Sequence, residues 1–194
     1  MFFIVWDVIF TNLGVWGFNP KYLVGINLIN LPIEEWLFFL IIPYSSLFIY
    51  VCLNYFIKKD IIGDHGVTIA RILGPLLILV AIFSYFQAYT FWNFMFAGLF
   101  LILQGYYLKS SYLGRFFMAY LVHLIPFLIV NGILTGSFIA EPIVWYNNEE
   151  NLGIRIGTIP VEDTIYALLL LLMNVTFYEG HLFRRRFLKD VDSM

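Results

Sequence analysis

The sequence predicts an all-α fold, a polytopic bundle of transmembrane helices with about five full spans and a short N-terminal segment. Of its 194 residues, 61% are hydrophobic and only 12% are charged. Soluble domains are about 45–50% apolar and about 25% charged, so this chain has too little polar surface to cover a water-soluble body. Its apolar residues also fall into runs of the length that a membrane span requires.

The first apolar run, residues 2–13, is shorter than the roughly 20 residues that a span needs, and Asp7 interrupts it. Five longer runs follow, and each suits a helix that crosses about 30 Å of hydrocarbon at about 1.5 Å per residue. They cover residues 32–57, 69–86, 91–108, 116–134 and 160–183. Pro32 and Pro160 occupy first-turn positions, where a proline removes no helical hydrogen bond.

The basic residues predict how the bundle is oriented. If every span reverses direction, nine of the eleven lysines and arginines fall at one end, and only Lys21 and Arg155 fall at the other. The positive-inside rule places the basic end, with the C-terminus, in the cytoplasm. Loops 14–31 and 135–159 and the acidic motifs that follow them then lie near the outer side. We expect an integral protein of a bacterial or archaeal cell membrane.

Two pairs of adjacent carboxylates begin apolar runs, Glu34-Glu35 after Pro32 and Glu162-Asp163 after Pro160. A helix dipole favours an acid in the first turn by about 0.3–1 kcal/mol, which explains one acid per helix better than two. Neighbouring residues of a helix point about 100° apart, so one acid of each pair can face the bundle and the other the headgroups. Carboxyls that share a poorly solvated space divide into proton donors and acceptors. The pairs therefore predict an acid–base site.

A repeat with an offset of 128 residues relates the two acidic motifs. Gly25 aligns with Gly153, and Pro32-Ile33-Glu34-Glu35 aligns with Pro160-Val161-Glu162-Asp163. We expect two parallel-orientation repeats, residues 1–90 and 91–194, related by a pseudo-twofold axis along the membrane normal. The acid pairs would then meet where the two halves join.

Other polar and aromatic residues lie close to these motifs. Asp7 has Arg155 or an outer-loop group as its expected partner, and Arg155 is also close enough in sequence to pair with Glu162 or Asp163. Aromatic rings near the acids suit a cationic intermediate, because a ring face attracts positive charge. The cysteine and histidine residues form no pattern typical of a metal site.

Several motifs together resemble a known family. Trp6-Asp7, Gly14-Val15-Trp16-Gly17-Phe18 and the run from Leu31 to Phe39 carry the resemblance in the first half. Pro142–Asn147, Gly153-Ile154-Arg155 and Ile159–Asp163 carry it in the second half. These residues are similar to the lycopene cyclase domain of the heterodimeric or fused, non-flavin type. The resemblance implies a fused form with a further helix before the Trp6-Asp7 segment, and the sequence begins without that helix.

The resemblance implies a lycopene β-cyclase-like isomerase (an intramolecular lyase) of carotenoid biosynthesis, which needs no cofactor and no metal. A carboxylic acid would protonate the terminal double bond of lycopene, and a carboxylate would remove a ring proton after closure, giving a β-ionone ring. The expected catalytic residues are Glu34, Glu35, Glu162 and Asp163. The expected substrate-binding residues are Trp6, Asp7, Trp16, Trp36, Phe39, Trp145 and Arg155, with Pro32 and Pro160 setting the helix starts.

The expected partners are a lipophilic polyene, membrane lipid, and either a second copy of the chain or other carotenoid-pathway enzymes, with no nucleic acid. Three alternatives stay open at this point. The enzyme could act on C50 carotenoids, or it could be a hydratase in which water captures the same cation. The third alternative is a non-catalytic carrier or transporter of a carotenoid or lipid, which uses the junction of the two halves as a polar site.

Overall fold

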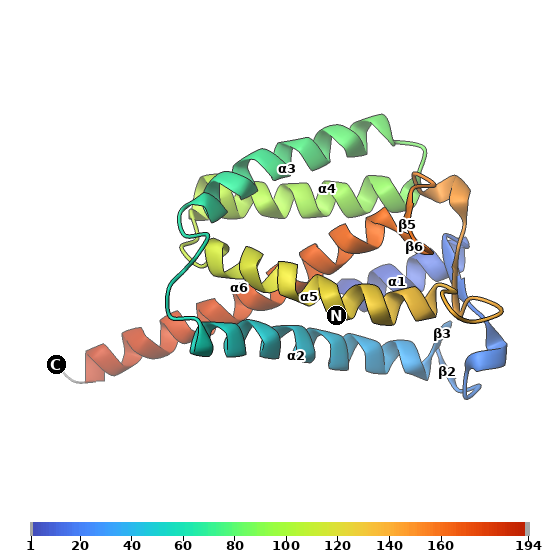
Figure 1. Cartoon of the computed structure of the whole chain (residues 1–194), viewed down its shortest axis with the longest axis horizontal. Coiled ribbons are helices and arrows are strands. Elements are labelled where there is room, and N and C mark those ends of the chain that lie inside the picture. Colours follow the sequence, from blue (N-terminus) through green and yellow to red (C-terminus); the bar gives the residue numbers. More distant parts are fainter. Residues whose placement is uncertain (1, 193–194) are drawn as a thin grey trace.

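A computed structural model describes residues 2–192 as a bundle of six α-helices that lie roughly along one long axis (Figure 1). Their bounds are α1 Phe2–Leu13, α2 Ile33–Phe56, α3 His65–Phe83, α4 Ala88–Ile102, α5 Leu113–Leu134 and α6 Val161–Asp192. A π-helical turn, Leu103–Leu108, extends α4, and five of the helices are then long and apolar enough to cross a membrane. The predicted all-α bundle with five spans and a short N-terminal helix is confirmed.

Three small antiparallel sheets gather at one end of the bundle (Figure 1), in loops for which the sequence predicted no strand. Strand β1, Trp16–Phe18, pairs with β4, Val144–Tyr146, and so ties the first long loop to the second. Two hairpins lead directly into helices. They are β2–β3, Asn27–Leu28 with Leu31–Pro32 before α2, and β5–β6, Arg155–Ile156 with Ile159–Pro160 before α6.

The two hairpins enter their helices in the same way. The Ile33 N–H donates to the Ile26 carbonyl at 2.8 Å, and the Val161 N–H donates to the Ile154 carbonyl at 3.0 Å, each pair 128 residues from its counterpart. The helices begin at Ile33 and Val161, so the prolines end the hairpins. Their predicted place in the first turn is wrong by one residue, because the hairpin holds each proline in an extended strand.

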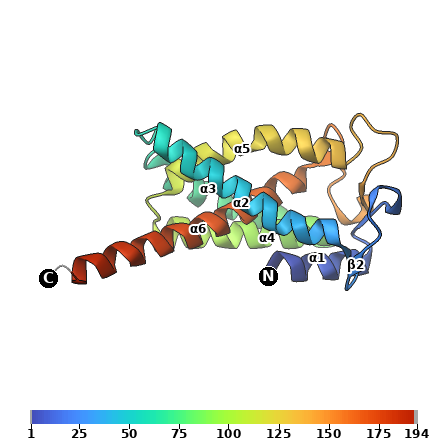
Figure 2. The same ribbon diagram turned by 90° about the horizontal axis from the view of Figure 1, so that it is seen from below.

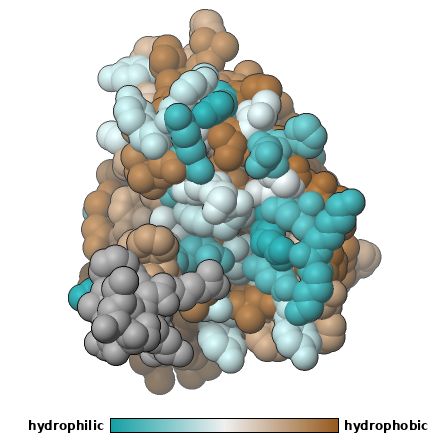
Figure 3. Space-filling view, turned by 90° about the vertical axis from the view of Figure 1, so that its left-hand side faces the viewer, coloured by the Kyte–Doolittle hydropathy of each residue, from teal (hydrophilic) through white to brown (hydrophobic). Residues whose placement is uncertain are grey.

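Helix directions separate the two ends of the molecule. Helices α2, α4 and α6 begin at the hairpin end, and α3 and α5 return to it, so loops 57–64 and 109–112 lie at the opposite end (Figure 1). Figure 3 shows that opposite end, where hydrophilic side chains gather among apolar ones. Placement of this end in the cytoplasm stays a prediction from the loop charges.

Helices α3 and α4 pack with their backbones in close contact, and glycines permit this. A Cβ built on Gly98 would lie 2.8 Å from the Gly74 carbonyl oxygen, and one on Gly74 would lie 3.1 Å from the Gly98 carbonyl oxygen. Small residues let membrane helices approach until their backbones touch, where dispersion forces and polar contacts replace the hydrophobic effect. Helix α1 occupies only the hairpin-side half of the bundle, beneath α4 in Figure 2.

Candidate active site

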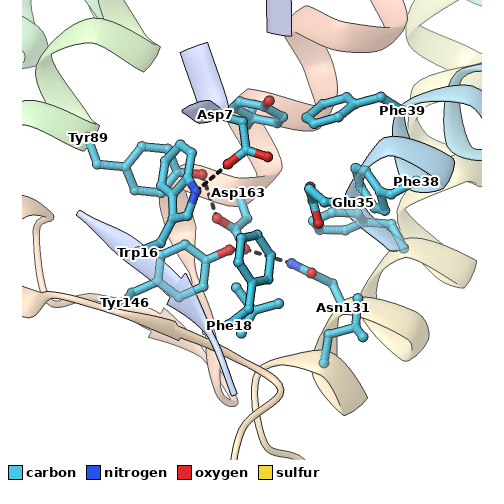
Figure 4. A pocket seen from close by; sticks show the side chains of 14 residues that line it. Asp7, Trp16, Phe18, Glu35, Phe38, Phe39, Tyr89, Asn131, Tyr146 and Asp163 are labelled. Carbon is cyan, nitrogen blue, oxygen red and sulfur yellow. Dashed lines mark hydrogen bonds between the residues drawn. The ribbon is translucent and has the colours of Figure 1, made fainter. Parts of the chain in front are cut away.

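Three helix segments bring three carboxyl groups to one cavity at the hairpin end (Figure 4). Asp7 comes from the middle of α1, Glu35 from the first turn of α2 and Asp163 from the first turn of α6. The cavity has a volume of about 80 Å³. One acid of each predicted pair therefore shares a space with the other, and Asp7 joins them.

Asp163 is buried and fully supplied with hydrogen-bond donors. Its Oδ1 accepts from the Tyr89 hydroxyl at 2.5 Å, and its Oδ2 accepts from Asn131 Nδ2 at 2.7 Å and from the Tyr146 hydroxyl at 2.9 Å. Burial and the neighbouring Asp163 raise the pKa of Tyr146, in strand β4, well above its usual value. Tyr146 thus remains a proton donor, and the three donors together suit a carboxylate acceptor.

Asp7 has donors on one oxygen only. Its Oδ1 accepts from Trp16 Nε1 at 2.5 Å and from the Thr11 hydroxyl at 3.2 Å, whereas its Oδ2 is buried without a hydrogen-bond partner among the described residues. Burial raises the pKa of Asp7 to about 6, against the opposing effects of the hydrogen bonds from Trp16 and Thr11. Glu35 lines the same cavity, and two carboxyls in one poorly solvated space resist double ionisation, so we expect this pair to retain one proton.

Arg155 pairs with none of the expected acids. Its guanidinium donates to the Thr158 carbonyl at 2.6 Å and to Asn148 Oδ1 at 2.7 Å, and it stands 5.9 Å from the centre of the Tyr146 ring. The predicted pairing of Arg155 with Asp7, Glu162 or Asp163 is wrong, whereas the other partner expected for Asp7, a group of loop 14–31, is confirmed by the bond from Trp16. The tight β5–β6 hairpin turns this side chain back onto its own loop.

Glu34 and Glu162 point away from the cavity and hold the loops instead. Glu34 Oε1 accepts the Val24 N–H at 2.7 Å, and Glu162 Oε1 accepts the Leu152 N–H at 2.8 Å. Glu162 also accepts from the Thr90 hydroxyl at 2.6 Å and is completely buried, so it does not face the headgroups as the sequence predicted. The angle between adjacent helical residues sends one acid of each pair to the cavity and the other to the hairpin.

Comparison with known proteins decides the family. The family model for lycopene cyclase matches residues 1–53 and 86–181. The chain belongs to the lycopene cyclase family. The bifunctional lycopene cyclase/phytoene synthase of Neurospora crassa is 27% identical over 150 residues, which cover 73% of this chain and 21% of that protein. The chain thus spans about a fifth of that relative's length. No solved structure matches.

The residues matched to the lycopene cyclase family include every residue that lines the carboxyl cavity, whereas α3 lies outside the matched segments. In the part of the chain that the structure describes, no group of three His, Cys, Asp or Glu side chains is arranged to hold a metal ion. The cavity of this lycopene cyclase family member is lined by carboxyl groups, tyrosine hydroxyls, one amide, and aromatic and aliphatic side chains.

The aromatic residues predicted to bind substrate occupy three different places relative to the cavity. Trp16 and Phe39 line the cavity. Trp6 packs behind it, with its ring centre 5.2 Å from that of Tyr166. Trp36 and Trp145 lie outside it, because Trp36 Nε1 donates to the Leu28 carbonyl at 3.3 Å and the Trp145 ring covers Gly17.

The sequence analysis did not assign several residues that line the cavity of this lycopene cyclase family member. They are Phe18, Tyr89, Phe127, Asn131, Leu134, Val144 and Tyr166. Asn131 and Tyr166 had a usable signal. Asn131 is an amide within an apolar span, where a polar group needs a partner, and Tyr166 lies one helical turn after Asp163 and thus on the same face.

Proposed function

We propose that this protein is an intramembrane carotenoid cyclase that converts the ψ end groups of lycopene to β-ionone rings without oxidation or reduction. The observation that carries the proposal is the meeting of three carboxyls, Asp7, Glu35 and Asp163, in one cavity walled by aromatic rings. Membership of the lycopene cyclase family supports the substrate class.

The hydrogen bonds divide the roles of the three acids. The proton that the Asp7 and Glu35 pair retains goes to the terminal double bond of the end group, which leaves a tertiary carbocation. A second double bond attacks this cation and closes the six-membered ring. Asp163, held by three donors, takes a proton from the ring and so forms the new double bond. One proton is added and one is removed, so the product is an isomer of the substrate.

Aromatic rings suit the cation between these steps. The rings of Trp16, Tyr89 and Tyr146 stand around Asp163, with centres 5.0 to 6.3 Å apart. A ring face attracts a nearby cation by about 0.5–2 kcal/mol, the larger value where water is excluded. A small cavity also keeps water from the cation, and water would otherwise give a hydrated product.

Glu34 and Glu162 act as positioning residues in this proposal. Each fixes the loop that precedes its helix, through the N–H of Val24 or Leu152. These equivalent bonds, and the equivalent hairpins, support the hypothesis that residues 1–90 and 91–194 are two related halves in parallel orientation. The carboxyl cavity would then lie at their junction, near the outer side of the membrane.

Pigment analysis in lycopene-producing cells tests the function. The chain should yield cyclised carotenoid, and Glu35→Gln and Asp163→Asn, made separately, should leave lycopene unchanged. Glu149→Gln, at an exposed loop position, is the matched control and should retain activity. Normal cyclisation in both cavity variants would refute the acid–base roles.

Mass spectrometry separates the alternatives in the same cells. A ring isomer has the mass of lycopene, a hydrated product gains one water, and a product from a C50 carotenoid has a longer carbon skeleton. Lycopene that co-purifies with the protein and never changes would favour a carrier.

A further inference from the structure

A second cavity continues from the carboxyl cavity into the bundle. It lies between α2, α5 and α6, has a volume of about 260 Å³, and is lined mainly by apolar side chains. We call it the α2–α5 groove. Five residues line both it and the carboxyl cavity: Phe38, Phe127, Asn131, Leu134 and Tyr166. Phe38 and Asn131 stand on one side of the carboxyl cavity, next to Glu35 (Figure 4).

The carboxyl cavity is too small for a whole polyene. Pockets that enclose small-molecule ligands measure about 300–1,000 Å³, whereas this cavity measures about 80 Å³. It has room for one end group near the three acids. The remainder of a long substrate must therefore lie in an adjoining space.

The α2–α5 groove has the depth that a long hydrocarbon requires. Along α2 its lining runs from Phe38 to Ile49, about two thirds of the way along the helix. Eleven residues at 1.5 Å per residue span about 16 Å, or roughly half of the 30 Å hydrocarbon layer. Ser45, Pro126 and Val130 line the groove and are exposed on the outer surface of the bundle. The groove is thus open sideways to lipid.

We propose that the α2–α5 groove binds the polyene chain of the substrate, which enters from the lipid between α2 and α5 and places one end group beside the three acids. The proposal rests on the proposed cyclase function for the identity of the polyene. It assigns the groove to a linear hydrocarbon, and Phe38 and Phe127 to the passage between groove and acids.

The polar pair at the deep end of the groove is compatible with a hydrocarbon. The Ser46 hydroxyl donates to the Ile42 carbonyl at 2.8 Å, so its oxygen is left to accept from His123 Nδ1 at 3.3 Å. A polyene without oxygen atoms passes this pair without breaking a hydrogen bond. Most of the other lining side chains are apolar and have no hydrogen bond to lose.

A larger apolar groove lies between α1 and α4 and is the rival route. It has a volume of about 490 Å³, but it shares no lining residue with the carboxyl cavity. Trp6 packs on Tyr166 with ring centres 5.2 Å apart, and Phe10 packs on Trp16 at 5.0 Å. These tilted, closely packed rings separate the rival groove from the acids.

Two tryptophan substitutions block the α2–α5 groove from opposite walls. Val130→Trp acts from α5, and Ser45→Trp acts from α2, so the test does not depend on the folding of one variant. Ile129→Trp, exposed next to Val130 on α5, is the matched control, and Ile9→Trp fills the rival groove. Purified proteins in lipid nanodiscs are titrated with lycopene, and binding is followed by the circular dichroism that the bound polyene acquires. Cyclised product is measured in lycopene-producing cells.

Val130→Trp and Ser45→Trp should each weaken lycopene binding by about tenfold or more, the effect of losing roughly two CH₂ groups of buried contact. Both should lose product to a similar extent, while Ile129→Trp and Ile9→Trp should match the unmodified protein. If the unmodified protein binds lycopene without cyclising it, and the two groove variants lose binding, the groove assignment stands and the proposed function fails. Unchanged binding in both groove variants, loss in Ile9→Trp instead, or no binding by the unmodified protein would overturn the groove assignment.

Discussion

Glu162 and Asp163 are neighbours in the chain, yet changing each to its amide should damage different properties. In Asp163→Asn the three donors and the fold around them remain, but the proposed base is lost. A positioned general base contributes about 10²–10⁴-fold to rate, so turnover per folded molecule should fall by that factor. With its amide oxygen in the place of Oδ2, the new asparagine can keep the bonds from Asn131 and Tyr146, and its NH₂ group can donate to the Tyr89 hydroxyl oxygen once that hydroxyl rotates.

Glu162→Gln should reduce stability far more than turnover. The amide oxygen can keep the bonds from the Leu152 N–H and the Thr90 hydroxyl. Its NH₂ group then takes the place of Oε2, which is buried without a partner among the described residues. An unsatisfied buried donor costs about 1–3 kcal/mol, and each kcal/mol lowers the unfolding midpoint by about 2–4 °C in a chain of this size.

Both variants are assayed in the same detergent or nanodisc preparation. Thermal unfolding measures stability, and cyclised carotenoid per folded molecule measures turnover, with Glu149→Gln as the exposed acid-to-amide control. If Glu162→Gln loses turnover as severely as Asp163→Asn without a change in unfolding midpoint, the division between clamp and base is wrong.

Two further predictions concern Asp7 and the α3–α4 contact. Because burial raises the pKa of Asp7 from 3.8 to about 6, the folded state binds a proton more tightly than the unfolded state. Stability should fall by about 3 kcal/mol as pH rises from about 4 to 6 and then level off. Asp7→Asn should flatten this dependence in thermal unfolding, and an unchanged slope would exclude Asp7 as its source. Gly98→Val should reduce the free energy of unfolding by about 1–3 kcal/mol, because its Cβ would lie 2.8 Å from the Gly74 carbonyl oxygen. The unfolding midpoint should fall accordingly. Gly180→Ala, with open space around the added Cβ, is the control, and equal midpoints in both variants would contradict the close contact.

The sequence predicted which segments form membrane-length helices, because this depends on the hydropathy and length of each run of neighbouring residues. Five apolar runs of membrane length predicted the five spans, and their ends differ from the structure by a few residues. The start of α3 at His65 was missed by four residues, because the first turn of this helix is polar and the prediction relied on hydropathy. The short strands were missed because two- and three-residue strands carry no periodic pattern.

Site residues were harder to predict than helices. The acid pairs predicted a shared acid–base site, and the structure places Glu35 and Asp163 at one cavity, whereas Glu34 and Glu162 bind hairpin amides. Arg155 was paired with the acids on closeness in sequence alone, and the hairpin turns it elsewhere. The family resemblance extends through the residues that line the cavity.

The sequence by itself determined the number of spans, their alternating directions and the position of an acid pair at the start of two of them. These follow from hydropathy and helical rise, which neighbouring residues specify. Only the tertiary structure decided that Asp7 joins Glu35 and Asp163, and that the α2–α5 groove opens from their cavity. A membrane helix that is apolar on every side carries no stripe to mark its inner face. Its rotation is set by packing against other helices, and that rotation selects which acid of each pair faces the cavity.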